Sequence, residues 1–211
     1  MKSVFRTFLV LAFSAIFCVA QASELEDKVA SLNMGLGGYV IGKVLTDEQK
    51  KIAKTNVASE KAYAGTYKFK DKNLNVIAKK SNDRVLIVYE DYGTVDGKKM
   101  KEIIGKCFID YSEPTATAHE KMLYWSYDKN GKLLTDEDLK KYKDSLSAEV
   151  QEGNLADTIK TKNQKVDFDA YITVKLVSSQ EIMIKENEIK DASVYLMLSS
   201  GKLLEEITSG N

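Results

Sequence analysis

Residues 85–111 read VLIVYEDYGTVDGKKMKEIIGKCFIDY, and this stretch contains both patterns that decide the fold. Residues 85–89 are apolar on both faces of a strand, which predicts a strand inside a sheet rather than at its edge. Residues 100–111 carry apolar side chains at helical spacing, with charged side chains elsewhere around the helix. The members of this apolar stripe are Met100, Ile103, Ile104, Cys107, Phe108 and Tyr111. A buried strand followed by an amphipathic helix predicts an α+β domain.

The residues before this stretch predict a hairpin or short meander. Tyr67 and Phe69 alternate with lysines, residues 74–80 form a second strand, and the polar residues 81–83 form the turn into the central strand. Further upstream, residues 25–32 have near-helical apolar spacing and are followed by Gly35, Gly37 and Gly38, which we expect to end a short helix. Thr46 and Gln49 form a capping box that predicts the start of another helix.

The residues after the helix predict more strands and one more helix. Residues 122–127 are an aromatic strand, Asn130-Gly131 is a tight-turn dipeptide, and residues 135–150 begin with a capping pattern and continue as a helix. Beyond a polar stretch at 151–164, residues 166–177 alternate as a half-buried strand, and residues 194–198 form another. Residues 182–189 are consistent with either strand or loop.

These elements predict an antiparallel sheet of about five to seven strands, because strands with one polar face are typical of antiparallel sheets. We expect the two main helices, residues 100–111 and 135–150, to pack on one face of it. Residues 23–150 then form an α+β domain, and residues 151–211 form either a β-rich extension of the same sheet or a small appendage.

The first 22 residues have the pattern of a secretory signal peptide. Lys2 and Arg6 precede an apolar run, and Ala20-Gln21-Ala22 provides the small residues that a signal peptidase recognises, so we expect cleavage after Ala22. The uninterrupted apolar run, residues 7–20, is shorter than the about 20 residues that a spanning helix needs. The mature chain is therefore expected in the periplasm or outside the cell, with no integral membrane segment.

The composition of this mature chain excludes several classes of protein. Cleavage removes Lys2 and Arg6 from the 31 basic residues, which leaves 29 against 31 acidic residues and a net charge of −2. A near-neutral chain of mixed charge lacks the basic patch of a nucleic-acid-binding protein and the polybasic segment of a protein that binds anionic membranes. Cys107 is the one cysteine left, so no internal disulfide can form.

We expect no catalytic residue, metal site or cofactor. Cys107 lies on the apolar stripe, where a free cysteine behaves as a small hydrophobic residue rather than as a nucleophile, and His119, the one histidine, lies in a polar loop. The Asp128 segment lacks the ligands of a calcium loop, since Lys132, Leu133 and Leu139 occupy required positions. The glycines at 35–38 lack the third glycine and the preceding strand of a dinucleotide-binding loop.

Aromatic residues are the strongest candidates for an interaction surface. Tyr124, Trp125 and Tyr127 lie on one short strand and His119 lies just before it. Tyrosine and tryptophan are favoured at protein interfaces because they bury a large area and keep a polar end. We predict an interaction surface at these four residues, with cross-strand packing in the core as the alternative for the aromatic side chains.

One local pattern supports the same interpretation. The helix at 100–111, the loop Glu113-Pro114-Thr115, the strand Leu123-Tyr124-Trp125-Ser126-Tyr127 and the turn at Asn130-Gly131 follow one another. This pattern resembles the helix–strand envelope modules of the outer-membrane assembly lipoprotein family related to β-lactamase inhibitor proteins. The resemblance implies a non-enzymatic module that binds other proteins through a sheet face. The chain departs from the lipoprotein pattern because no cysteine begins its mature part.

Three functions follow as hypotheses. The first is an exported, non-enzymatic protein that binds another protein or component of the cell envelope. The second is a carrier of a small apolar ligand or lipid, with a cavity between the sheet and the helices. The third is a hydrolase with two carboxylates converging in a cleft, an arrangement that sequence alone does not show.

Overall fold

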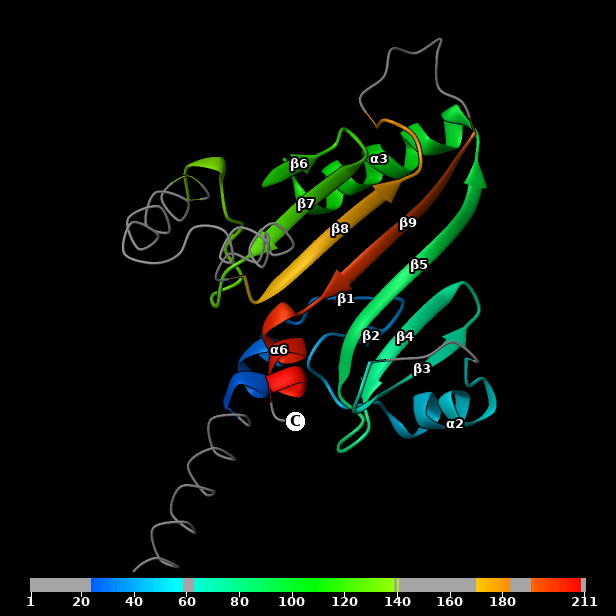
Figure 1. The fold of residues 1–211 in the computed structure, drawn as a ribbon, viewed down its shortest axis with the longest axis vertical. Helices are drawn as coiled ribbons and strands as arrows, with labels where there is room; N and C mark the ends of the chain where they lie inside the picture. The colour runs from blue at the N-terminus through cyan, green and yellow to red at the C-terminus, as the bar shows by residue number, and fades with distance from the viewer. Residues whose placement is uncertain (1–23, 59–62, 139, 141–169, 183–190, 210–211) are drawn as a thin grey trace, which may run out of the picture.

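The computed structural model describes residues 24–58, 63–138, 140, 170–182 and 191–209. These residues form an α+β fold around a seven-stranded antiparallel sheet with the strand order β3-β4-β5-β9-β8-β7-β6 (Figure 1). A separate two-stranded hairpin precedes it. The strands are β1 (Gly35–Leu36), β2 (Tyr39–Val40), β3 (Thr66–Asp71), β4 (Leu74–Lys79), β5 (Val85–Val95), β6 (Ala116–Ala118), β7 (Met122–Tyr127), β8 (Ile172–Ser178) and β9 (Ala192–Ser199).

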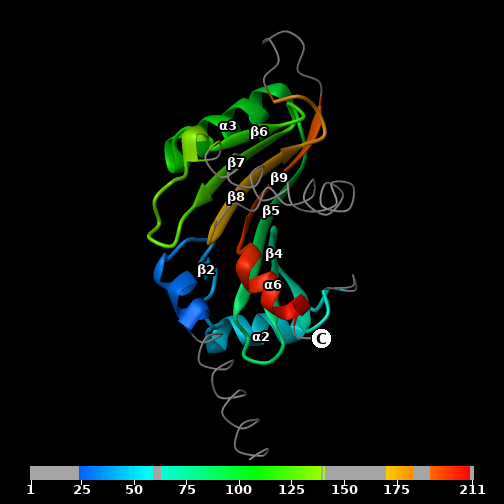
Figure 2. The same ribbon diagram turned by 60° about the vertical axis from the view of Figure 1, so that its left-hand side comes forward.

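The helices lie on both sides of this sheet. Figure 1 shows α3 (Gly97–Tyr111) behind the strands and α6 (Gly201–Ser209) in front of their lower end, and the turned view in Figure 2 agrees. α2 (Asp47–Thr55) packs near β3, and residues 24–31 form a further helix. The predicted capping box is confirmed, because Thr46 Oγ1 accepts from the Gln49 N–H and Gln49 Oε1 accepts from the Thr46 N–H.

The pairing of β5 with β9 joins the two halves of the sheet. Its register runs from Ile87 opposite Ser199 to Val95 opposite Ala192, and β9 also pairs with β8. The prediction that residues 85–89 lie inside the sheet is confirmed, since β5 has β4 on one side and β9 on the other. The predicted strand at 194–198 therefore lies in the centre of the sheet, between β8, the strand just before it in the chain, and β5, which comes about a hundred residues earlier.

One face of the sheet forms the main core with α3. The predicted apolar stripe is confirmed, since Met100, Ile103 and Cys107 are buried. Trp125 of β7 is fully buried beneath this helix, with its ring 6.3 Å from Phe108 and 5.7 Å from Tyr111 between centroids. The α3 helix begins one turn earlier than its apolar stripe, because the Asp96 carboxylate accepts from the Lys99 N–H as an N-cap.

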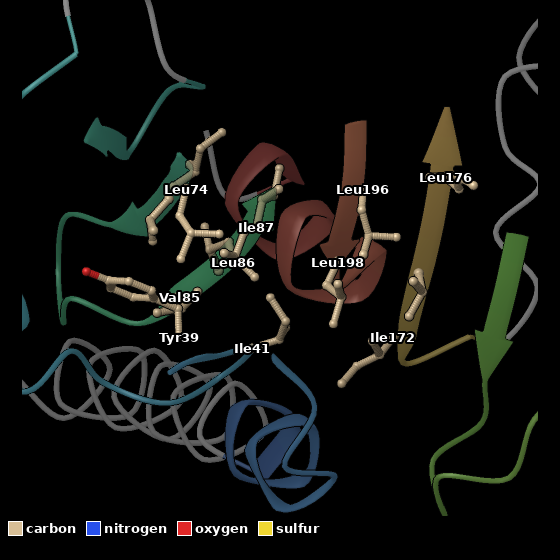
Figure 3. Packing of buried hydrophobic residues seen from close by; sticks show 14 of the residues in the cluster. Tyr39, Ile41, Leu74, Val85, Leu86, Ile87, Ile172, Leu176, Leu196 and Leu198 are labelled. Carbon is tan, nitrogen blue, oxygen red and sulfur yellow. The ribbon is translucent and has the colours of Figure 1, made fainter. Parts of the chain in front are cut away.

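The N-terminal residues close the other end of the same core. Figure 3 shows Ile41, Leu198 of β9 and Ile172 of β8 converging from three parts of the chain. Glu26 of the helix at 24–31 is buried and forms ion pairs with Lys79 Nζ at 2.6 Å and Arg84 Nε at 2.8 Å. These contacts tie the helix at 24–31 to the turn between β4 and β5.

Some sequence-based expectations need correction or lie outside the described residues. The segment Gly35–Val40 does more than end a helix: it forms the β1–β2 hairpin, with Gly37 and Gly38 at positive φ in its turn. Of the predicted helix at 135–150 the structure describes only the start, helical at 136–138 and 140, so its packing on the sheet lies outside the described residues. Residues 166–169 and most of 182–189 also lie outside them.

The two faces of β7 give a direct test of this core. We expect Trp125→Ala to lower the free energy of unfolding by about 3–5 kcal/mol, because it leaves a cavity under α3. Tyr124→Ala, on the neighbouring residue, is the matched control and is expected to cost on the order of 1 kcal/mol, since Tyr124 is only half-buried. Urea denaturation followed by far-UV circular dichroism measures both values, and equal losses would contradict the assignment of Trp125 to the core.

Candidate functional site

The seven-stranded sheet has a second face that carries a different set of side chains. Because side chains alternate along a strand, the neighbours of the buried core residues point away from α3. They include Lys68 on β3, Ile77 on β4, Tyr89 on β5, and Tyr195 and Met197 on β9. We call this the open face. α6 lies at its lower end in Figure 1.

A groove runs across the open face. It has a volume of about 740 Å³ and adjoins a second depression of about 420 Å³, with which it shares Lys68, Tyr89 and Asp91. The groove is lined by Tyr63, Lys68, Ile77, Ile87, Tyr89, Asp91, Gly93, Thr94, Ser193, Tyr195 and Met197. The second depression extends it over β3 and residues 56–58. The two together form one surface that crosses four strands of the sheet.

Aromatic and cationic groups are arranged in pairs on the open face. The Lys68 ammonium lies 5.4 Å from the centroid of the Tyr89 ring, and Tyr89 meets Tyr195 edge to face at 6.4 Å. A second ammonium, Lys175 Nζ, lies 5.0 Å from the centroid of the Tyr124 ring. Cation–π contacts of this kind stabilise by about 0.5–1 kcal/mol at exposed sites, so they hold the rings and the charges in defined positions.

A β-bulge shapes the middle of the groove. The register of β5 and β9 shifts between Asp91 and Gly93, which leaves Tyr92 as the extra residue. Gly93 has a φ of 66°, and its N–H donates to Asp91 Oδ1 at 2.9 Å. One oxygen of the Asp91 carboxylate is thus occupied by the bulge itself.

The rims of the groove carry exposed apolar side chains. Val57 is 66% exposed and Tyr63 is 54% exposed, and both line the groove or its extension. Large apolar side chains at the edge of a concave surface are a feature of binding sites. This part of the described surface is therefore the strongest candidate for a binding site.

The phenols of Tyr195 and Tyr124 on the open face stay protonated near neutral pH. Burial raises the pKa of Tyr195, and the neighbouring Tyr89 adds to the shift; burial also raises the pKa of Tyr124, with a smaller contribution from Tyr195. A neutral phenol both donates and accepts a hydrogen bond. The tyrosines can therefore bind a partner through the ring and the hydroxyl together.

The four residues that the sequence grouped as one interaction surface lie in different places. Tyr124 belongs to the open face. Trp125 belongs to the core instead, where its Nε1–H donates to the Ser112 carbonyl oxygen at 2.9 Å. Tyr127 is half-buried and packs against the core, and His119 is exposed in the turn between β6 and β7 with a φ of 51°. Successive side chains of a strand point to opposite faces of the sheet, so the consecutive residues Tyr124 and Trp125 cannot lie on the same face.

Sequence reasoning missed Tyr195 and Met197. Both lie on β9 opposite β5, and that pairing joins residues about a hundred positions apart in the chain. The available signal was the alternation along residues 193–197, where Val194 and Leu196 are aliphatic and Ser193, Tyr195 and Met197 lie on the opposite face. Alternation alone does not identify the neighbouring strand.

Cys107 and His119 do not form a nucleophilic pair. Cys107 is buried on α3, and burial raises the pKa of its thiol to about 12, with Asp110 raising it further and Lys106 opposing. His119 lies on an exposed turn. The thiol is protonated near neutral pH and enclosed by the core, so it lacks the thiolate that nucleophilic catalysis needs.

Two further features are absent from the described residues. They contain no group of three or more histidine, cysteine, aspartate or glutamate side chains placed to hold a metal ion. None of their helices is long and apolar enough to span a membrane.

One carboxyl group at the lower end of the sheet is unusual. Glu206 of α6 has a buried Oε2 atom without a hydrogen-bond partner among the described residues. Burial raises the pKa of this carboxyl group, Lys79 lowers it, and the Glu26 carboxylate raises it. The two nearby cations, Lys79 and Arg84, already form ion pairs with the Glu26 carboxylate. The Glu206 carboxyl group therefore lies in a partly buried position beside cations that another carboxylate already neutralises.

Comparison of the chain with protein-family models, with curated protein sequences and with solved structures gave no match.

The first prediction from this site concerns the thiol. Cys107 is expected to react with a thiol reagent such as DTNB at pH 7 at least about a hundredfold more slowly in the folded protein than in urea, because the thiol is buried and protonated. Peptide mass spectrometry after quenching measures the labelled fraction at Cys107. Rapid labelling of Cys107 in the folded protein would contradict a buried, protonated thiol.

The second prediction concerns pH. Because the pKa of Glu206 is raised in the folded protein, the folded state binds more protons than the unfolded state above the ordinary carboxyl pKa of 4.5. The stability that this group contributes is therefore present at acidic pH and is lost as pH rises through the folded pKa. We expect Glu206→Gln to raise the melting temperature at pH 7 and to reduce the fall of the melting temperature as pH rises above the ordinary carboxyl pKa of 4.5.

The exposed Glu113→Gln is the matched control for this experiment. It is expected to leave the pH profile of the melting temperature unchanged. A lower melting temperature for Glu206→Gln at pH 7 would show that the carboxylate stabilises the fold and would contradict the assignment.

Proposed function

We propose that this chain is an exported, non-enzymatic binding protein that holds another protein of the cell envelope on its open face. The observation that carries the proposal is the groove lined by Tyr89, Tyr195 and Met197, with exposed Val57 and Tyr63 at its rims. Tyrosine and methionine are enriched in protein–protein interfaces. Export is supported by the signal-like pattern of residues 1–22.

The construction of the sheet supports a binding role over a purely structural one. α3 and the N-terminal elements cover one face, whose side chains are buried, whereas Tyr89, Tyr195 and Met197 on the other face remain half-buried in the described structure. Their positions are fixed by central strands rather than by loops, and a rigid scaffold limits the entropy that is lost on binding.

A carrier of a small apolar ligand is the second candidate. The groove volume of about 740 Å³ lies in the size range of small-molecule sites, and Ile77, Ile87 and Met197 provide apolar lining. Lys68 and Asp91 line the same groove. A mixed, open groove of this kind fits a protein surface better than it fits a wholly apolar molecule.

An affinity pull-down with variants tests the proposal. The tagged protein is recovered from the envelope fraction of its own host, and the co-purifying proteins are identified and quantified by mass spectrometry. We expect a stoichiometric partner, and we expect its recovery to fall on the order of tenfold with Tyr89→Ser/Tyr195→Ser, since central aromatic residues dominate interface energies.

The matched control is Ile109→Ser on α3, the most exposed large apolar side chain among those described, at 84%. It removes apolar area away from the open face and is expected to leave recovery unchanged. Recovery without any partner protein would contradict the proposal, and native mass spectrometry of the same sample would then test for a bound small molecule. Equal recovery of the partner with the unsubstituted protein and with Tyr89→Ser/Tyr195→Ser would exclude the open face as the binding site.

A further inference from the structure

The end of the groove at the β-bulge gathers hydrogen-bond acceptors around one aromatic ring. Strand register places Asp91 of β5 directly opposite Tyr195 of β9, and it places Thr94 directly opposite Ser193. All four side chains line the groove. Directly opposite residues on one face of an antiparallel pair have Cβ atoms about 4.5–5.5 Å apart. A carboxylate, a phenol ring and two hydroxyl groups therefore lie together, and we call these four residues the acceptor cluster.

The Asp91 carboxylate carries a negative charge that no described cation neutralises. Asp91 is exposed, and no ion pair joins it to a lysine or arginine among the described residues. The Gly93 N–H donates to its Oδ1 atom and so orients the side chain from the backbone of the bulge. The other oxygen, Oδ2, remains able to accept hydrogen bonds from a partner.

The lysines nearest to the acceptor cluster are engaged elsewhere. Lys68 is only 9% exposed, and its ammonium group lies over the Tyr89 ring. The ammonium group of Lys175 lies over the Tyr124 ring, and both lysines have a further interaction within the chain. In contrast, no ammonium or guanidinium group of the described residues lies over the Tyr195 ring. The charge in the groove that has no partner among the described residues is therefore negative.

One exposed lysine of the open face lies further away. Lys70 lines the second depression and belongs to β3, which is two strand spacings from β5 and three from β9. At about 4.8 Å per spacing these separations are roughly 10 and 14 Å. Both exceed the Debye length of about 8 Å at physiological ionic strength, so salt screens the effect of Lys70 on the acceptor cluster.

A guanidinium group matches the acceptor cluster better than an ammonium group does. It is planar, donates five N–H groups in a fixed fork and stacks on aromatic rings, whereas an ammonium group is a compact point charge. The cluster offers Asp91 Oδ2 and the hydroxyl oxygens of Thr94 and Ser193 as acceptors beside the ring of Tyr195. Hydrogen bonds between ionised groups are roughly twice as strong as those between neutral groups.

From the acceptor cluster we infer that the partner inserts an arginine side chain into the groove, with its guanidinium group hydrogen-bonded to Asp91 and packed on Tyr195. The inference rests on the proposed binding function and names the chemistry that the partner presents. Arginine is among the residues that dominate the energies of protein interfaces. Ile77, Ile87 and Met197 line the rest of the groove, so we expect apolar residues beside the arginine to cover them.

Selection from a displayed library of random eight-residue peptides tests the inference, using the protein purified after export. We expect the enriched peptides to share an arginine with aromatic or aliphatic neighbours. Enrichment of peptides without arginine, or no enrichment at all, would overturn the inference. Lysine found as often as arginine at the shared position would also overturn it, because a point charge would then be sufficient.

A double-mutant cycle provides the second readout. Fluorescence anisotropy gives the Kd of one labelled enriched peptide and of the same peptide with citrulline, an uncharged analogue, in place of arginine. Asp91→Asn keeps a side-chain oxygen to accept the Gly93 N–H. We expect citrulline and Asp91→Asn each to raise the Kd on the order of tenfold, and the two together to raise it little further, because either change alone already breaks the charged pair. Losses that multiply independently would overturn the inference.

Glu113→Gln is the matched control, since it also removes one negative charge, from an exposed position in the loop after α3. It is expected to change the Kd of the arginine peptide less than twofold. A loss equal to that of Asp91→Asn would overturn the inference, because net charge rather than the acceptor cluster would then explain the binding.

The pull-down separates this inference from the proposed function. A partner whose recovery falls with Tyr89→Ser/Tyr195→Ser but is unchanged by Asp91→Asn would overturn the inserted arginine and leave the proposed binding function standing. Absence of any protein partner would overturn both. We expect Asp91→Asn to lower recovery of the partner on the order of tenfold, as for the peptide.

Discussion

The antiparallel pairing of β5 with β9 is the constraint on which the rest of the structure depends. It brings Ile87 opposite Ser199 and Val95 opposite Ala192, and it connects β3 and β4 to β8, β7 and β6 in one sheet. The paired residues are about a hundred positions apart in the chain, and closing so long a loop costs conformational entropy. Burial of Val88, Leu196 and Leu198 in the shared core offsets that cost. Without this pair there is no continuous sheet and no groove.

The same pairing creates both faces of the molecule. Alternation sends Leu196 and Leu198 into the core and sends Tyr195 and Met197 to the open face, where Tyr195 meets Tyr89. A shift of one residue in this register would exchange the two sets and expose the apolar side chains. The need to bury the core therefore also fixes the positions of the residues that we propose bind a partner.

The sequence predicted much of this fold because most of its signals are local. The apolar stripe of α3, the capping box at Thr46 and the alternation of β3 each depend on residues only a few positions apart. The strand order depends on residues far apart in the chain and could not be predicted, because no pattern within residues 192–199 identifies β5 as the neighbouring strand. The β1–β2 hairpin was missed because three glycines also fit the end of a helix.

The candidate site was harder to predict than the fold for the same reason. Grouping Tyr124 with Trp125 treated neighbours in sequence as neighbours on a surface, whereas a strand sends them to opposite faces. The open face is assembled from β3, β4, β5, β8, β9 and β7, so its composition follows from register rather than from any motif. Tyr89 was among the aromatic residues of the sequence, but its partners Tyr195 and Met197 come from the last strand.

Photocrosslinking inside the host tests most directly whether the open face touches a partner. A photoreactive amino acid replaces Tyr195 in one variant and Ile109, on the helix behind the sheet, in the other, and the envelope is irradiated and resolved by mass. The account predicts a discrete adduct with another protein at position 195 and none at position 109. An adduct at position 109 alone, or no adduct at position 195, would contradict it.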